Sequence, residues 1–411
     1  MSNDKQPEIR FPGFTEDWEQ RKLGEVVERV TRKNKKLESI RPLTISAQEG
    51  LIDQNEFFNK TVASRDVSGY YLVKKGEFAY NKSYSNGYPW GAVKRLNQYD
   101  MGVLSTLYIV FKPKKIDSDF LEKYYDTTYW YKEVSKHAAE GARNHGLLNI
   151  AASDFFETEI VMPLKIEEQQ KIGAFFKQLD DTIALHQRKL DLLKETKKGF
   201  LQKMFPKNGA KVPEIRFPGF TGDWEQRKLG DVLTVSKEKN KSNSYSKEQI
   251  LSVSREVGTV NQIEYQGRSF AGADISGYKI VYPGQLIYTK SPLKGAPYGI
   301  FQLVTEEGIV SPLYAVYNST EQALASFIGL QLKSDNIATH YLSPLVSKGA
   351  KNTINITDEG ALDGRVTYPT ITEQQKIVAF FKQLENTITL HQRKLDLLKE
   401  TKKGFLQKMF V

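Results

Sequence analysis

The chain carries one long segment twice. Residues 166–205 read IEEQQKIGAFFKQLDDTIALHQRKLDLLKETKKGFLQKMF, and residues 371–410 read ITEQQKIVAFFKQLENTITLHQRKLDLLKETKKGFLQKMF, with five differences across forty aligned positions. A second block, PEIRFPGFTEDWEQRKLGEV at residues 7–26, recurs with two differences at residues 213–232. The chain is therefore a tandem duplication of one unit.

The long repeated segment has the apolar heptad spacing of a coiled coil, with a polar interruption at a histidine and another at a lysine. A helix over residues 167–205 would be about 58 Å long at 1.5 Å per residue. We expect Pro206 to stop the first helix, and Thr372 with Gln375 to form a capping box at the start of the second. Because neither seam can be buried alone, we expect the two helices to pair as an antiparallel coiled coil with a pseudo-two-fold relation. The predicted seam consists of Ile172, Phe176, Leu179, Ile183, His186, Leu190 and Leu193, repeated as Ile377, Phe381, Leu384, Ile388, His391, Leu395 and Leu398.

Between the repeated blocks the two halves have diverged, but a framework of turn residues survives. Glycine and proline mark turns that the backbone must keep, whereas the residues between them are free to change what is contacted. This pattern predicts one fold with two different surfaces. The matched turn residues are Gly69, Gly76, Gly87, Pro89 and Gly91 in the first half, and Gly277, Gly284, Gly295, Pro297 and Gly299 in the second.

The variable segments have the composition of mixed helix and sheet. We expect one helix at residues 119–137 and β-rich runs at residues 72–80, 104–111, 278–288 and 309–317. The predicted fold class is α/β (α+β), with two globular recognition domains per chain, separated by the two long helices. We predict domains at residues 1–160 and 213–366, long helices at residues 161–205 and 367–411, and a linker at residues 206–212.

Composition bounds the partners and the compartment. The 411 residues include no cysteine, which excludes disulfides and thiolate metal sites and fits a reducing compartment. Neither a signal-like N-terminal segment nor an apolar run of about 18 residues occurs, so we expect a cytoplasmic protein with no membrane partner. A net charge of +10 favours a polyanionic partner such as double-stranded DNA.

Candidate DNA contacts are polar or basic residues beside the shared turns of the diverged segments. Lys82 and Lys290 stand in the same Lys-Ser context and suit a sequence-independent phosphate contact. We align Gln48 with Arg255, a pairing of interest because glutamine suits adenine and arginine suits guanine. The full candidate set is Gln48, Lys82, Tyr84, Asn86, Arg143, Asn144 and His145 in the first half, and Arg255, Lys290, Lys294, Lys351 and Asn352 in the second.

The sequence offers no catalytic set. It contains no Gly-Lys dipeptide and hence no phosphate-binding P-loop, and its five histidines show no metal-ligand spacing. An enzyme with its own reading domain would need a catalytic domain for which the duplication leaves no room. A coiled-coil scaffold that binds only proteins remains an alternative, although it gives the two halves no reason to diverge while their helices stay nearly identical.

The duplicated order of motifs resembles the specificity subunit of type I restriction-modification enzymes. The residues that carry the resemblance are Glu168-Gln169-Gln170-Lys171-Ile172 with their copy at 373–377, and Phe11-Pro12-Gly13-Phe14 with Trp18-Glu19-Gln20 and their copy at 217–226. The resemblance implies a non-catalytic subunit whose two domains each read half of an interrupted DNA target, while the helices set the gap. It also implies two methyltransferase partners, restriction subunits bound through them, no cofactor in this chain, and S-adenosylmethionine, ATP and Mg²⁺ in the partners.

Overall fold

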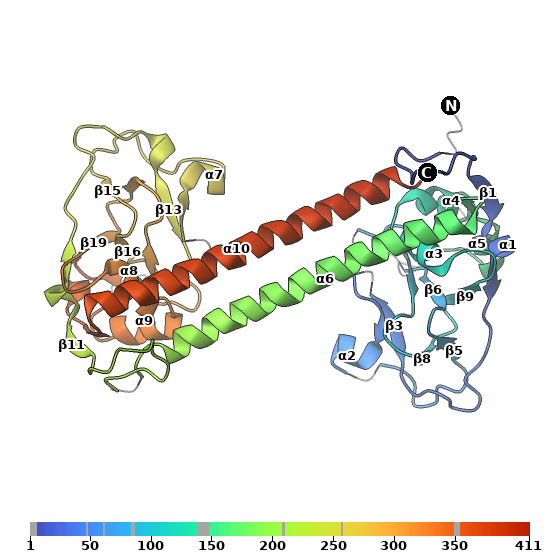
Figure 1. Ribbon diagram of the computed structural model, residues 1–411, viewed down its shortest axis with the longest axis horizontal. Helices are drawn as coiled ribbons and strands as arrows, with labels where there is room; N and C mark the ends of the chain where they lie inside the picture. Colours follow the sequence, from blue (N-terminus) through green and yellow to red (C-terminus); the bar gives the residue numbers. More distant parts are fainter. Residues whose placement is uncertain are drawn as a thin grey trace. The chain divides into compact units, whose positions relative to one another are not determined.

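The computed structural model describes residues 6–46, 48–60, 62–83, 87–138, 148–207, 210–255, 258–348 and 354–411. The chain divides into two compact units. Unit 1 comprises residues 1–188 together with 392–411, and unit 2 comprises residues 189–391 (Figure 1). Each unit therefore contains a globular part and a portion of each long helix.

Unit 1 contains a four-stranded antiparallel sheet in the order β2-β9-β6-β7 and three two-stranded pairs, β1-β10, β3-β4 and β5-β8. Its elements are β1 (Glu19–Lys22), α1 (Leu23–Val26), β2 (Val27–Arg29), β3 (Leu43–Ser46), β4 (Gly50–Asp53), α2 (Gln54–Phe58), β5 (Tyr71–Lys74), β6 (Phe78–Asn81), β7 (Ala92–Arg95), β8 (Met101–Leu104), β9 (Ile109–Pro113), α3 (Ser118–Tyr125), α4 (Tyr129–His137), α5 (Ala152–Glu157) and β10 (Glu159–Met162).

Unit 2 repeats this topology with the sheet order β12-β19-β16-β17 and the pairs β11-β22, β13-β14 and β15-β18, and its described residues also form the pair β20-β21. The internal repeat and the mixed α+β class are thus confirmed. Its elements are β11 (Glu225–Lys228), η2 (Leu229–Asp231), β12 (Leu233–Val235), η3 (Lys247–Gln249), β13 (Leu251–Ser254), β14 (Gly258–Asn261), α7 (Gln262–Gln266), β15 (Lys279–Val281), β16 (Leu286–Tyr288), β17 (Phe301–Leu303), β18 (Gly308–Val310), β19 (Ala315–Ser319), α8 (Ala325–Gln331), α9 (Asp335–Leu342), β20 (Ser347–Lys348), β21 (Ile354–Asn355), η5 (Gly360–Leu362) and β22 (Arg365–Tyr368).

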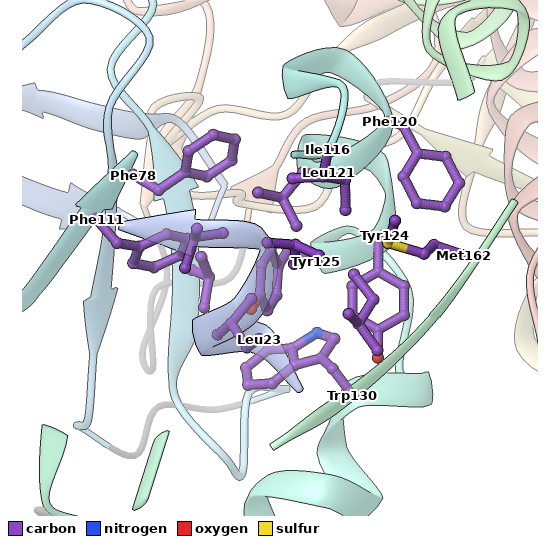
Figure 2. Close-up of a cluster of buried hydrophobic side chains, with 14 of the residues drawn as sticks. Leu23, Phe78, Phe111, Ile116, Phe120, Leu121, Tyr124, Tyr125, Trp130 and Met162 are labelled. Atoms are coloured by element: carbon purple, nitrogen blue, oxygen red, sulfur yellow. The ribbon is translucent and has the colours of Figure 1, made fainter. Parts of the chain in front are cut away.

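The four-stranded sheet of unit 1 is covered on both faces. Successive side chains of a strand point to opposite faces. In β6, Phe78 and Tyr80 face a large aromatic cluster that includes residues of α3 and α4, whereas Ala79 packs with apolar residues of the β3-β4 hairpin. Figure 2 shows the first cluster around Phe78, Phe111 and Tyr125. Burial on both faces explains why β6 reads as a continuous apolar run and not as an alternating one.

Several predicted elements have the wrong extent. Each predicted β-rich run contains two strands of different sheets joined by a turn, as at Gly76, whose φ is +85° between β5 and β6. The predicted helix at residues 119–137 is broken into α3 and α4. The break occurs because the hydroxyl of Thr127 donates to the carbonyl of Tyr124 and accepts the N–H of Tyr129, so the side chain replaces helical bonds.

The long helices α6 (Ile166–Lys203) and α10 (Ile371–Lys408) contain 38 residues each. The start of α6 is held by buried polar side chains. Glu168 pairs with Arg10 through two hydrogen bonds of 2.6 and 2.8 Å. Gln169 accepts the N–H of Asp117 and donates to the carbonyl of Pro163. These contacts explain why the repeated block keeps Glu-Gln at this place.

The same contacts begin α10, where Glu373 pairs with Arg216 and Gln374 donates to the carbonyl of Pro369. The helix already starts at Ile371, so the predicted capping box with Thr372 as the N-cap is wrong by position. The prediction that α6 ends before Pro206 is confirmed, since its last helical residue is Lys203.

The two helices pair antiparallel within each unit. In unit 1 the rings of Phe175 and Phe405 have centroids 5.0 Å apart, and further along α6 Asp180 meets Lys402, which lies earlier in α10. In unit 2 the rings of Phe200 and Phe380 are likewise 5.0 Å apart. All fourteen predicted seam residues are buried or half-buried, and the antiparallel coiled coil is confirmed.

Each helix end completes the core of one unit. Phe410, at the end of α10, lies against Trp18 and Phe176 in unit 1, with ring centroids 6.4 and 5.9 Å apart. Phe205, just after α6, lies against Trp224 in unit 2 at 6.2 Å. Unit 1 therefore requires the last residues of the chain, and unit 2 requires the end of the first repeat.

Candidate nucleic-acid interface

A cleft of about 910 Å³ opens in unit 1. We call it the unit 1 cleft. Its lining comes from the turn of the β3-β4 hairpin, strand β7, the link between α3 and α4, and the C-terminal half of α10. The polar and charged residues that line it include Gln48, Glu49, Tyr88, Lys94, Arg95, Asn97, Gln98, Glu122, Lys123, Asp126, Tyr131, Asp180, Lys399, Lys402 and Lys403.

Three of the basic side chains in the unit 1 cleft share two carboxylates. The Nζ atom of Lys94 lies 3.0 Å from Oδ1 of Asp126. The Nζ atom of Lys123 lies 2.6 Å from Oδ2 of Asp180, and that of Lys402 lies 2.7 Å from Oδ1 of the same aspartate. A fourth base, Arg95, is held by Asp119 and Glu122 at 2.7 and 2.8 Å. These four cations are neutralised within the protein.

The shared carboxylate of Asp126 is charged at neutral pH. Burial raises its pKa, but the charges of Lys94, Lys123 and Lys402 outweigh burial and bring the pKa below its ordinary value of 3.8. Burial acts on Lys123 in the opposite direction by lowering its pKa, and the surrounding carboxylates, Asp126 first, raise the net value. The network is therefore a stable set of ion pairs.

Two lysines of the unit 1 cleft differ from these four. Lys399 and Lys403 of α10 are exposed, and within the described residues no carboxylate forms an ion pair with either of them. They stand four residues apart, which places them on one face of the helix. They are the basic groups of the cleft that remain available to an anion.

The unit 1 cleft also presents groups that can read base edges. Gln48 and Gln98 are exposed amides at its border, and Tyr88 and Tyr131 add aromatic rings. Amides form paired hydrogen bonds with adenine, and phosphate-binding lysines fix the position of a duplex. The arrangement can thus hold a polyanion while polar groups contact its bases.

The hairpins at the edge of each unit have the same framework. The pairings of β3-β4 and β13-β14 have the same register, with three residues between the paired ends. Counting along these turns gives Arg255 the position of Ala47, and Glu256 the position of Gln48. The predicted alignment of Gln48 with Arg255 is therefore wrong by one position, because the strand register and not residue type fixes the correspondence.

Around the hairpin the chemistry of the two units differs. By register, Lys94 of β7 corresponds to Gln302 of β17, whose side-chain amide donates to the carbonyls of Ser254 and Arg255. This glutamine holds the β13-β14 turn, whereas Lys94 pairs with Asp126. The two units thus place different groups at equivalent positions of one backbone framework.

The three lysines that the sequence predicts as DNA contacts have different surroundings in the structure. Lys82 is half-buried and its Nζ lies 3.3 Å from the carbonyl of Ile150. Lys290 is paired with Asp358 at 2.5 Å, and Lys279 donates to the same carboxylate. Lys294 is exposed. The two lysines that share the Lys-Ser context therefore have internal partners, and their phosphate contact stays a prediction.

Of the remaining candidates, Gln48 lines the unit 1 cleft and Arg255 lies in the equivalent turn of unit 2. The others lie outside the described residues: Tyr84, Asn86, Arg143, Asn144, His145, Lys351 and Asn352. Residues that sequence reasoning missed are Lys94, Arg95, Tyr131, Lys399 and Lys403. The last two belong to the repeated helix, where the two halves of the chain have not diverged.

The described part of the chain shows neither a cluster of metal-ligand residues nor a membrane-spanning helix. It contains no group of three or more histidine, cysteine, aspartate or glutamate residues placed to hold a metal ion. Among the same residues, no helix has the length and apolar character needed to cross a membrane.

Comparison with known proteins decides the family. The model of the type I restriction modification DNA specificity domain matches this chain twice, at residues 15–195 and 221–400. The chain belongs to this family. The two matches coincide with the duplication and cover most of the chain, so both units are specificity domains.

Individual relatives are distant in sequence. A putative type I restriction enzyme MjaX specificity subunit from Methanocaldococcus jannaschii is 23% identical over 298 residues, which cover 67% of this chain and 63% of the relative. The alignment thus spans less than two thirds of that relative. The crystal structure of a type I restriction-modification system S subunit from M. genitalium covers 99% of both chains with 12% identity and a TM-score of 0.57, and it shares the fold. The HsdS subunit from Thermoanaerobacter tengcongensis is 18% identical, covers 98% of this chain and 97% of its own, and has a TM-score of 0.44.

Proposed function

We propose that this chain is the DNA-reading subunit of a type I restriction-modification complex. Each unit reads one half of an interrupted target in double-stranded DNA, and the paired long helices set the gap between the halves. The chain performs no catalysis itself. Two methyltransferase subunits dock on it and bring S-adenosylmethionine, and restriction subunits join through them and use ATP and Mg²⁺.

The observation that carries this proposal is one framework with two chemistries. The β3-β4 and β13-β14 hairpins have the same register, yet their turns contain different residues, and Lys94 beside the first corresponds to Gln302 beside the second. A rigid scaffold that presents different polar groups at equivalent loops is the arrangement expected of two heads that read different bases.

Docking of two equivalent partners is supported by apolar residues outside the seam. Leu185 and Leu192 of α6 are 60% and 68% exposed, and Leu390 and Leu397 of α10 are both 67% exposed. A spacing of seven residues places each pair on one face of its helix. Exposed leucines repeated at equivalent positions indicate two equivalent surfaces for protein partners.

The proposal is tested by expressing the chain with a methyltransferase subunit of the same system in a host without DNA methylation. Modified adenines are then mapped by single-molecule sequencing. We expect a split motif of two short halves with a fixed gap. Methylation at a continuous site, or methylation that does not depend on this chain, would contradict two independent reading heads.

A further inference from the structure

The positive charge that the unit 1 cleft offers to a ligand comes from the long helix and not from the globular part. The basic residues Lys94, Arg95 and Lys123 of the globular part are engaged by carboxylates, as described above. Lys399 and Lys403 of α10 line the same cleft and are exposed, with no carboxylate partner among the described residues. A polyanion that enters the unit 1 cleft therefore meets these two ammonium groups.

The same lysines occur at equivalent places of the other repeat. Lys194 and Lys198 of α6 correspond to Lys399 and Lys403, and both are exposed in unit 2. Lys198 makes one exposed contact of 3.8 Å with Glu195 on its own helix. Such surface pairs contribute little and break easily.

Unit 2 has a lysine at the position where unit 1 has Asp126. Gln169 accepts the N–H of Asp117 just before α3, and Gln374 accepts the N–H of Leu324 just before α8. These equivalent hydrogen bonds show that Asp117 and Leu324 occupy corresponding positions in the two units. Asp126 lies nine residues after Asp117, and Lys333 lies nine residues after Leu324, so the two positions correspond. Asp126 neutralises the lysines around it, whereas unit 2 has another cation at that position.

We infer that the long helices themselves hold the DNA backbone, with Lys399 and Lys403 of α10 contacting phosphates beside unit 1 and Lys194 and Lys198 of α6 contacting phosphates beside unit 2. The inference rests on the proposed function and adds residues to it. These lysines are identical in the two repeats, so they do not distinguish the two half-targets. Phosphate contacts carry no sequence information and fix the position of the protein on the duplex, which is the role that an unvarying residue can fill.

In each unit the globular part and its phosphate-binding lysines come from different repeats of the chain. The helix that follows the second globular part provides the anchor of unit 1, and the helix that follows the first provides the anchor of unit 2. A new globular part can thus change the bases that are read while the phosphate contacts stay the same. Lysine suits this role because its long side chain carries a point charge without a fixed geometry.

The test uses the full-length chain and two double-stranded oligonucleotides of unrelated sequence. Binding is measured by fluorescence anisotropy over a range of KCl concentrations for the unaltered chain and for the variant K194A/K198A/K399A/K403A. Removal of each phosphate contact lowers the slope of log K against log salt by about 1, so the variant should lose about 4 in slope. The loss should be the same for both oligonucleotides.

The matched control removes the same charge from the same helices. Arg188, Lys189, Arg393 and Lys394 are exposed, and none of them lines the unit 1 cleft. The variant R188A/K189A/R393A/K394A should keep most of the slope. A second variant, K194R/K198R/K399R/K403R, should keep all of it, and the far-ultraviolet circular dichroism of all variants should match.

Equal loss of slope in the control and the test variant would overturn the inference, because only net charge would then matter. A test variant with the slope of the unaltered chain would also overturn it, while the proposed function would stand. If the unaltered chain showed no salt-dependent binding to either oligonucleotide, the proposed function would be contradicted, and the inference with it.

Discussion

The Nζ atom of Lys402 in α10 lies 2.7 Å from the Oδ1 atom of Asp180 in α6. Lys402 stands at a seam position that the heptad pattern assigns to an apolar residue, and its charge is met by an aspartate of the facing helix. The equivalent pair in unit 2 is Lys197 with Glu385. A polar residue in a coiled-coil seam selects one register, because every other register would leave its charge without a partner.

Removal of this partner should weaken unit 1. In Asp180→Ala, Lys123 and Lys402 both lose a carboxylate, and Lys123 is only 8% exposed. Hydrogen bonds to charged groups contribute about 1.5–3 kcal/mol, so we expect a loss of about 2 kcal/mol in the free energy of unfolding. Urea unfolding measures this loss in the free energy of unfolding. Asp181→Ala, at the exposed neighbouring position, is the control and should change little; an equal loss in both would show that the pair does not stabilise the unit.

The last residues of the chain should stabilise unit 1 and not unit 2. Phe410 is 2% exposed and packs against Trp18, Phe120 and Phe176. A buried phenylalanine replaced by alanine costs about 3–5 kcal/mol, so Phe410→Ala should raise hydrogen exchange throughout unit 1. Phe205→Ala should do the same in unit 2. If both variants loosened the same unit, the assignment of each helix end to one core would be wrong.

Acid should destabilise unit 2 through Asp358. Burial raises the pKa of this carboxyl, but hydrogen bonds and charges from Lys279 and Lys290 outweigh it and bring the pKa below 3.8. A carboxylate with a lowered pKa contributes stability above its ordinary pKa and loses it as the pH falls through the folded value. The midpoint temperature of thermal unfolding of unit 2 should therefore fall as the pH is taken below 3.8.

The variant Asp358→Asn separates this effect from general acid unfolding. It should cost about 2 kcal/mol at neutral pH, because the buried Lys279 and the half-buried Lys290 lose their carboxylate, and its stability should depend less on acid pH. Asp363→Asn removes only the exposed pair with Lys228 and serves as the control. An unchanged acid dependence in Asp358→Asn would assign the effect to other groups.

Exchange of one globular segment should change one half of the target. Replacing residues 43–150 with the corresponding segment of another specificity subunit leaves both long helices and all of unit 2 intact. We expect a new sequence in one half of the methylated motif, and the same second half and gap. A change in both halves, as read by methylation mapping, would contradict independent reading.

The long helices should act as the ruler between the halves. Insertion of seven residues before His186 and seven before His391 keeps the heptad phase in both helices. Each insertion adds about 10 Å of helix, which corresponds to about three base pairs at 3.4 Å each. The gap should grow by that amount while both halves stay the same. An insertion in one helix alone breaks the pairing and should abolish methylation; an unchanged gap with the double insertion would exclude the ruler.

Much of the architecture followed from local pattern. The duplication can be read from the sequence by direct comparison of the two copies, and the long helices and their seam can be read because heptad spacing is a pattern of neighbouring residues. Strand ends were less accessible, since a run such as residues 72–80 is apolar throughout. Only the sheet assignment shows that Gly76 separates two strands of different sheets.

The candidate site was predicted only in part, for a different physical reason. Lys82 and Lys290 look like free bases in the sequence, but the fold gives them the carbonyl of Ile150 and the carboxylate of Asp358 as partners. Conversely, Lys399 and Lys403 lie hundreds of positions from Gln48 and line the same cleft.

By itself the sequence determined that this chain is a duplicated unit with a coiled coil, and it pointed to the right family. Only the tertiary structure decided which lysines are neutralised, how the two hairpins correspond, and which helix end completes which core. A helix and its apolar stripe arise from residues a few positions apart, which a sequence displays. The charge that a site offers depends on partners brought together across the whole chain, as Asp180 is to Lys402, and no local pattern contains that distance.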